Sequence, residues 1–71
     1  MYKYKITRRE GYNTKQFLTK YLGWDSENEQ THLLFENYDA VVEVVLAFNK
    51  NAPVGNPMTQ IKYSADAVWV E

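Results

Sequence analysis

The stretch NYDAVVEVVLAFN at residues 37–49 decides the fold class, because it is the longest periodic segment of the chain. Its apolar residues recur at helical spacing, with acidic side chains between them. Asn37 suits the N-cap, where its side-chain oxygen accepts a hydrogen bond from the first turn. Asp39 near the start and Lys50 near the end interact favourably with the helix dipole. We predict a helix from Asn37 to about Asn49 whose apolar face consists of Tyr38, Val41, Val44, Val45 and Phe48.

Residues 2–7 predict a first strand. Tyr2, Tyr4 and Ile6 alternate with Lys3 and Lys5, and a period of two places alternate side chains on opposite faces of a sheet. We therefore expect the tyrosines to face the core and the lysines to face water. A loop with a glycine at its turn is predicted at residues 8–12.

A second, shorter helix is predicted at residues 13–22. Asn13 is a suitable N-cap with Gln16 three residues later, as in a capping box. Gly23 is suited to end the helix in a left-handed conformation. The apolar face of this helix would consist of Phe17, Leu18, Tyr21 and Leu22.

The rest of the chain predicts a loop at residues 25–30, a strand at 31–35, a turn-rich loop at 49–57 and a strand at 59–63. A turn at residues 64–66 and a short strand at 67–70 follow. The order is therefore β-α-β-α-β-β. It predicts one α+β domain over residues 1–71, with a single sheet of three to four strands and two helices on one face.

The composition limits the classes of function. A chain of 71 residues needs nearly all its large side chains for the core, which leaves little room for a substrate cleft. It has no cysteine, so a disulfide and a thiolate metal site are excluded. We expect no enzyme activity and no cofactor. The N-terminus does not resemble a signal peptide and the longest apolar run is too short to span a bilayer, so we expect a cytosolic protein without a membrane partner.

Two patterns that suggest chemistry are better explained structurally. His32 is the only histidine and lies in an apolar stretch, where a lone imidazole is most often structural. The acids of residues 25–36 fall at positions 1, 3, 5 and 12 of a calcium-binding loop, but Gln30 stands where that loop requires glycine. We therefore predict no metal site.

The charge is strongly polarised along the chain. Residues 1–20 carry a net charge of +5 and residues 21–49 a net charge of −6, although the whole chain carries only −1. Such polarity concerns partners and association rather than fold.

The acidic segment predicts a protein-binding surface. Tyr and Trp are over-represented among interface hot spots, and complementary charge speeds encounter. A basic nucleic-acid groove on another protein is the natural counterpart. In size and composition the chain resembles small phage accessory proteins, and that resemblance implies inhibition of a nucleic-acid-handling host protein. The simpler alternative is that the tryptophan packs in the core and the acids only solubilise a loop. The predicted partner-binding residues are Trp24, Asp25, Glu27, Glu29, Glu36 and Tyr38.

The basic segment supports a different function. Cations that contact phosphates, with aromatic rings that stack on bases, are typical of proteins that bind single-stranded nucleic acid. A third alternative is self-association into a homodimer through the opposite charges, although these charges can equally neutralise each other within one monomer. The candidate nucleic-acid-binding residues are Lys3, Lys5, Arg8, Arg9, Lys15 and Tyr12.

Overall fold

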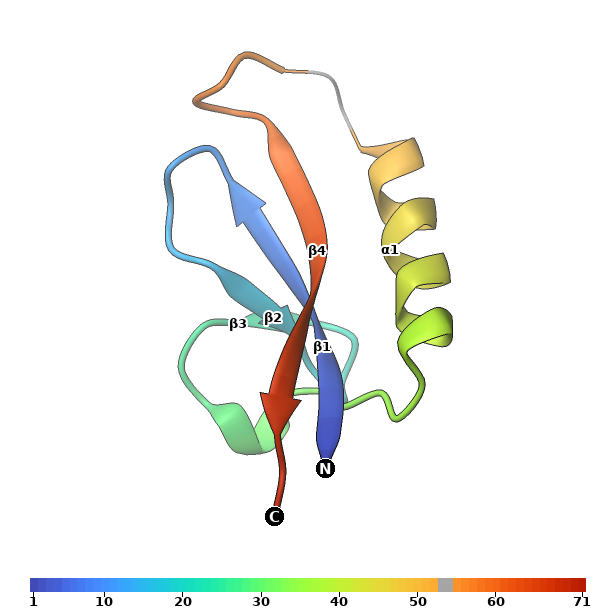
Figure 1. Ribbon diagram of the computed structural model, residues 1–71. Coiled ribbons are helices and arrows are strands. Elements are labelled where there is room, and N and C mark those ends of the chain that lie inside the picture. The colour runs from blue at the N-terminus through green and yellow to red at the C-terminus, as the bar shows by residue number, and fades with distance from the viewer. Residues whose placement is uncertain (53–54) are drawn as a thin grey trace.

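The computed structural model describes residues 1–52 and 55–71. It is a small α+β fold with one antiparallel four-stranded sheet in the order β3-β2-β1-β4 and one α-helix (Figure 1). The elements in chain order are β1 Tyr2–Glu10, β2 Gln16–Leu18, β3 Trp24–Asp25, the 3₁₀ turn η1 Glu29–Thr31, α1 Tyr38–Asn51 and β4 Ile61–Trp69. The predicted α+β class is thus confirmed.

The two long strands β1 and β4 form the longest pair of the sheet, with β1 inside the sheet and β4 at its edge. They pair without interruption, from Tyr2 opposite Trp69 to Glu10 opposite Ile61. The predicted glycine turn follows β1, where Gly11 has a φ of 55° and its N–H donates to the Gln60 carbonyl at 2.8 Å. Glycine adopts this left-handed conformation without the clash that a Cβ introduces.

Helix α1 confirms the helix predicted at residues 37–49 and continues to Asn51. The Asn37 side chain accepts hydrogen bonds from the N–H groups of Asp39 at 2.8 Å and of Ala40 at 3.3 Å, as expected of an N-cap. The helix covers one face of the sheet, where the core contains Ile6, Leu18, Val41 and Val45, and the partly buried residues around it are Tyr4, Trp24, Leu33, Phe35, Val44, Phe48, Tyr63 and Ala65.

The helix predicted at residues 13–22 is wrong, because the structure has strand β2 and a turn there. Phe17 and Leu18 point to opposite faces: Leu18 lies in the core, whereas Phe17 contacts His32. β2 pairs with β1 through Thr7 and Arg8. A helix this short is marginal in water, so hydrogen bonding along the edge of a nine-residue strand prevails over a locally helical pattern.

Other boundaries also differ from the prediction. Residues 31–35 form two isolated bridges, Thr19 with His32 and Tyr4 with Phe35, instead of a strand. The turn predicted at residues 64–66 lies inside the continuous strand β4. There Asp66 Oδ2 accepts a 2.7 Å hydrogen bond from the Thr7 hydroxyl, so a residue typical of turns finds its partner across the sheet.

The predicted arrangement of two helices on one face is therefore not what the described residues form. α1 covers one face, and residues 25–33 cover part of the other, which we call the polar face (Figure 1). Of the loop predicted at residues 49–57, the first three residues continue α1 and residues 53–54 lie outside the described part. Within residues 1–52 and 55–71, no helix has the length and apolar character that a membrane crossing requires.

Candidate functional site

The polar face holds two buried polar side chains in contact. Lys5 from the centre of β1 is 7% exposed and His32 is 1% exposed. Lys5 Nζ lies 2.9 Å from His32 Nδ1. An ammonium group has only donors, so Lys5 donates and His32 Nδ1 accepts.

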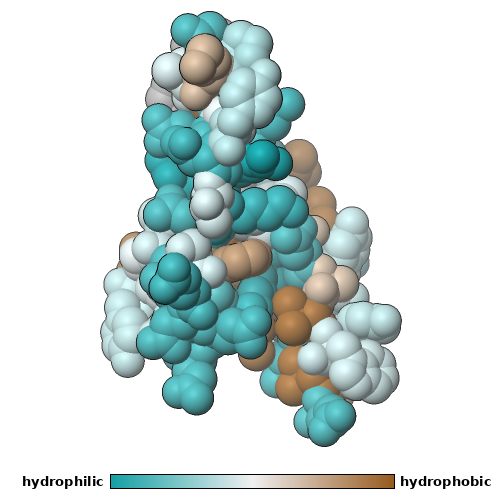
Figure 2. All heavy atoms as spheres, turned by 90° about the vertical axis from the view of Figure 1, so that its left-hand side faces the viewer, coloured by the Kyte–Doolittle hydropathy of each residue, from teal (hydrophilic) through white to brown (hydrophobic). Residues whose placement is uncertain are grey.

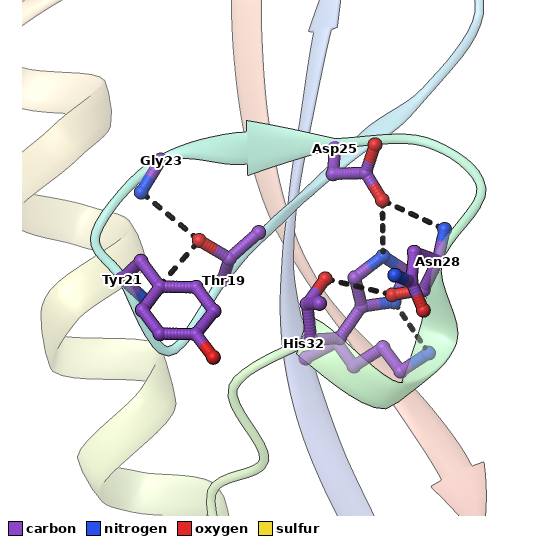
Figure 3. A network of polar contacts seen from close by, with 8 residues as sticks. Thr19, Tyr21, Gly23, Asp25, Asn28 and His32 are labelled. Atoms are coloured by element: carbon purple, nitrogen blue, oxygen red, sulfur yellow. Dashed lines mark hydrogen bonds and ion pairs between the residues drawn. The ribbon is translucent and has the colours of Figure 1, made fainter.

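Asp25 extends this contact toward the surface (Figure 3). His32 Nε2 is 3.8 Å from Asp25 Oδ2, too long for a hydrogen bond, and it has no hydrogen-bond partner within the described part of the chain. Asp25 Oδ2 itself accepts from the Asn28 N–H at 2.7 Å. The Phe17 ring centroid lies 4.8 Å from that of His32 and 5.0 Å from Lys5 Nζ. Lys5, His32 and Asp25 thus connect the central strand to residues 25–32.

The burial of Lys5 corrects the prediction that the lysines of β1 face water. The alternation itself is correct, since Lys5 lies on the face opposite α1. Residues 25–32 cover Lys5 on that face, however, and lysine is rarely buried without a partner. Tyr2 departs from the prediction in the opposite sense, because it is 60% exposed although it lies on the helix face.

The network around Asp25 fixes residues 26–31, which we call the acidic loop. The Thr31 hydroxyl and N–H both donate to the Asn28 carbonyl, at 2.8 and 3.0 Å. The Lys20 N–H donates to the Thr31 carbonyl at 2.8 Å and joins the loop to the turn that follows β2. Glu27 and Glu29 are exposed, and neither side chain forms an ion pair with another described residue.

The turn between β2 and β3 exposes two large apolar side chains. Thr19 Oγ1 accepts hydrogen bonds from the N–H groups of Tyr21 at 3.3 Å and Gly23 at 3.1 Å (Figure 3). Tyr21 is 82% exposed and Leu22 is 80% exposed. Leu22 also has a φ of 64° and is the one non-glycine residue with a positive φ among the described residues.

We define the β3 edge surface as Tyr21, Leu22, Glu27 and Glu29. The first two precede β3 and the last two follow it, and β3 is an edge strand of the sheet. The side of the molecule that carries β2 and β3 is mainly hydrophilic (Figure 2). Sequence reasoning missed Tyr21 and Leu22, because helical spacing assigned them to a core face. The signal against that helix was its threonine and asparagine content, since both are poor helix formers.

Two residues of the predicted acidic and aromatic patch are used inside the fold. Trp24 is half-buried, and its ring centroid lies 5.9 Å from that of Phe48 and 5.7 Å from that of Tyr63. Asp25 is half-buried beside His32. Both side chains thus make contacts within the chain.

Two other members of that patch lie at the start of α1. The exposed Glu36 pairs with Lys3 at 3.6 Å. Tyr38 is 55% exposed, and its ring packs edge-on against Tyr4 with centroids 5.3 Å apart. The structure therefore separates the predicted patch. Glu27 and Glu29 lie in the acidic loop, Trp24 packs against the core, Asp25 lies beside His32, and Glu36 and Tyr38 lie at the start of α1.

All five predicted basic residues have polar partners within the chain, and for Arg9 this is the Asn13 carbonyl, to which Nε donates at 3.2 Å. Besides Lys3 and Lys5, Arg8 donates to Gln16 Oε1 at 2.8 Å and lies 3.6 Å from Glu10. Lys15 lies 3.9 Å from Asp66. Only Lys3 and Lys15 pair with carboxylates from outside residues 1–20, so these contacts compensate only part of the charge that the sequence concentrates there.

Arg9, the fifth cation, lies in a surface cavity of about 250 Å³ at the far end of the β1–β4 pair. Lys62 stands directly opposite it in the register, and like charges in that position are destabilising. The nearby Tyr12 is 73% exposed. Neither cation forms an ion pair with a described residue. The residues that line the cavity are Arg9, Gly11, Tyr12, Pro57, Gln60 and Lys62.

Comparison with known protein families, with curated proteins and with solved structures finds nothing that matches this chain. The described residues contain no group of three or more His, Asp or Glu side chains placed to hold a metal ion.

Proposed function

We propose that this chain is a non-enzymatic protein-binding module whose contact surface is the β3 edge surface. The observation that carries the proposal is Leu22, a large apolar residue that is both 80% exposed and in the left-handed region. The left-handed conformation costs an L-residue about 1–2 kcal/mol, and such strain concentrates at functional positions. Neither the fold nor the core needs a leucine there.

The buried network supports the proposal because it preorganises the surface. Two long-range contacts hold the acidic loop: His32 to Lys5 on β1, and the Thr31 carbonyl to the Lys20 N–H. A rigid loop loses little conformational entropy when it binds, which favours affinity. Glu27 and Glu29 are therefore presented in a fixed geometry on the segment that follows β3, and Tyr21 and Leu22 lie on the turn that precedes it.

The chemistry of this surface defines the partner. Two unpaired carboxylates favour a basic surface, and Tyr21 with Leu22 favours an apolar depression next to it. A nucleic-acid-binding groove of another protein combines cations with flat apolar surface. We infer that the chain blocks such a groove on a host protein, as an inhibitor from a phage would, and that it acts in the cytosol.

The experiment is an affinity capture with matched baits from a lysate of the cells in which the chain acts. The baits are the wild-type chain, Leu22→Gly, the double variant Glu27→Lys/Glu29→Lys, and the control Asp39→Lys on the exposed side of α1. We expect the wild type and the control to enrich a basic protein. The captured amount of that protein should fall at least tenfold with Leu22→Gly and with Glu27→Lys/Glu29→Lys. A protein captured equally by all four baits would contradict the proposal.

A second candidate function is supported by the Arg9–Lys62 cavity. Two opposed cations without carboxylate partners, next to an exposed Tyr12, form a site for a phosphate with a stacked base. Titration of fluorescent single- and double-stranded DNA and RNA tests it. With two phosphate contacts, affinity should fall about tenfold between 50 and 200 mM salt. Binding that is saturable and abolished in Arg9→Glu supports this candidate, and flat curves at both salt concentrations exclude it.

A further inference from the structure

The outer edge of β4 is open over half of its length. In the β1–β4 pair, Met1 and Val70 exchange both backbone hydrogen bonds, at 2.8 and 3.1 Å, and the register continues without a bulge. Hydrogen-bonded pairs alternate in an antiparallel ladder, so the even-numbered residues of β4 bond to β1. The odd-numbered residues therefore direct their N–H and C=O groups away from the sheet.

One of these outward residues is capped within the chain. Asn49 on α1 donates from Nδ2 to the Tyr63 carbonyl and accepts the Tyr63 N–H at Oδ1, each at 3.0 Å. The side-chain amide thus takes the place of a neighbouring strand. Ala65, Ala67 and Trp69 have no such cap among the described residues. Unpaired edge groups of this kind are a template for another strand.

We propose that this half-edge pairs with the same segment of a second copy, which forms an antiparallel β4–β4 dimer with its two-fold axis at Ala67. The axis places Ala67 opposite Ala67 of the second copy and Ala65 opposite Trp69, and all three outward residues of each chain are then paired. Centring on Ala65 would place Ala67 against Tyr63, which Asn49 already occupies. Centring on Asp66 would oppose two carboxylates and place Trp69 against Tyr63, which Asn49 already occupies.

The side chains suit this axis. Ala65 and Ala67 are small, and Trp69 is 61% exposed and packs edge-on against Tyr2. In the dimer each Trp69 would cover the Ala65 of the second copy. Asp66 would face Val68, so no like charges meet.

The helices also leave room for the dimer. At its start α1 lies above β1, where Tyr38 contacts Tyr4, and it reaches the edge of β4 only near Asn49. Near Ala67 the two helices would stand above the two β1 strands, which are three strand spacings or about 14 Å apart. Packed helices need about 8–10 Å, so no clash arises.

The test uses the absence of native cysteine. In Ala67→Cys the two Cα atoms would be about 5.5 Å apart across the axis, a distance that a disulfide spans. The control Ser64→Cys is also exposed on β4, but the proposed register separates its copies by about 20 Å. We expect Ala67→Cys alone to form a covalent dimer under mild oxidation. Equal cross-linking of both variants, or of neither, would overturn the proposal.

Sedimentation of the unmodified chain provides a measurement that needs no cysteine. We expect a concentration-dependent rise from 8.4 kDa toward twice that mass, and its loss in Ala67→Pro, which removes an outward N–H without removing a hydrogen bond to β1. A strictly monomeric wild type up to millimolar concentration would refute the dimer. It would leave the β3 edge surface untouched, because that surface lies at the opposite end of the sheet.

Discussion

Replacement of Leu22 by glycine should leave the stability of the chain nearly unchanged, although it removes a whole leucine side chain. Leu22 has a φ of 64°, and glycine relieves a left-handed strain of about 1–2 kcal/mol. Against this, glycine loses additional backbone entropy worth about 0.5–1 kcal/mol. The covered fifth of the side chain contributes about 0.3–0.6 kcal/mol to stability. The central expectation is a gain in the free energy of unfolding of about 0.3 kcal/mol, and the ranges above extend from a loss of about 0.6 to a gain of about 1.2 kcal/mol.

The matched variant Leu22→Ala isolates the strain. It removes nearly the same side chain but keeps a Cβ in the left-handed region. Leu22→Gly should therefore be about 0.5–1 kcal/mol more stable than Leu22→Ala. Urea unfolding followed by tryptophan fluorescence measures both free energies. If Leu22→Ala is as stable as Leu22→Gly, or more stable, the strain is absent and the main support for the binding surface is removed.

Three further experiments test the fold that presents this surface. Asn37→Ala removes the two capping hydrogen bonds of α1 and should cost about 1 kcal/mol in thermal or urea unfolding, whereas no loss would contradict the cap. Gly11→Ala should cost several times more than Asn37→Ala, because its Cβ would collide with the Met58 carbonyl in addition to the left-handed strain; a milder effect would show that the turn is placed differently. A double-mutant cycle of Lys5→Met and His32→Phe should give a coupling energy of about 1–3 kcal/mol, and a value near zero would mean that the two groups do not form their contact.

The parts of the fold that could be predicted from the sequence are those determined locally. Asn37 is a cap because its own side chain reaches the first turn, and the periodicity of residues 38–49 does not depend on any other segment. Gly11 is also a local signal, since the left-handed turn requires glycine.

The remaining parts depend on partners distant in the sequence. Phe17 and Leu18 are at helical spacing with Tyr21 and Leu22, and only the available edge of β1 makes the segment a strand. Lys5 could not be assigned to the interior, because its partner His32 is 27 residues away.

The candidate surfaces were predictable only in part for the same reason. Glu27 and Glu29 remain exposed as the polar sequence of their loop indicates. The opposition of Arg9 and Lys62, like the open edge at Ala67, follows from the register of β1 with β4, which no single segment specifies.

The most direct test of the binding surface is a ¹⁵N NMR titration of the labelled chain with the basic partner obtained by affinity capture. The proposed function predicts the largest shift changes at the amides of Tyr21, Leu22, Glu27 and Glu29, with little change along α1. Changes concentrated instead around Arg9 and Tyr12, or along Ala65–Trp69, would contradict the assignment of the β3 edge surface.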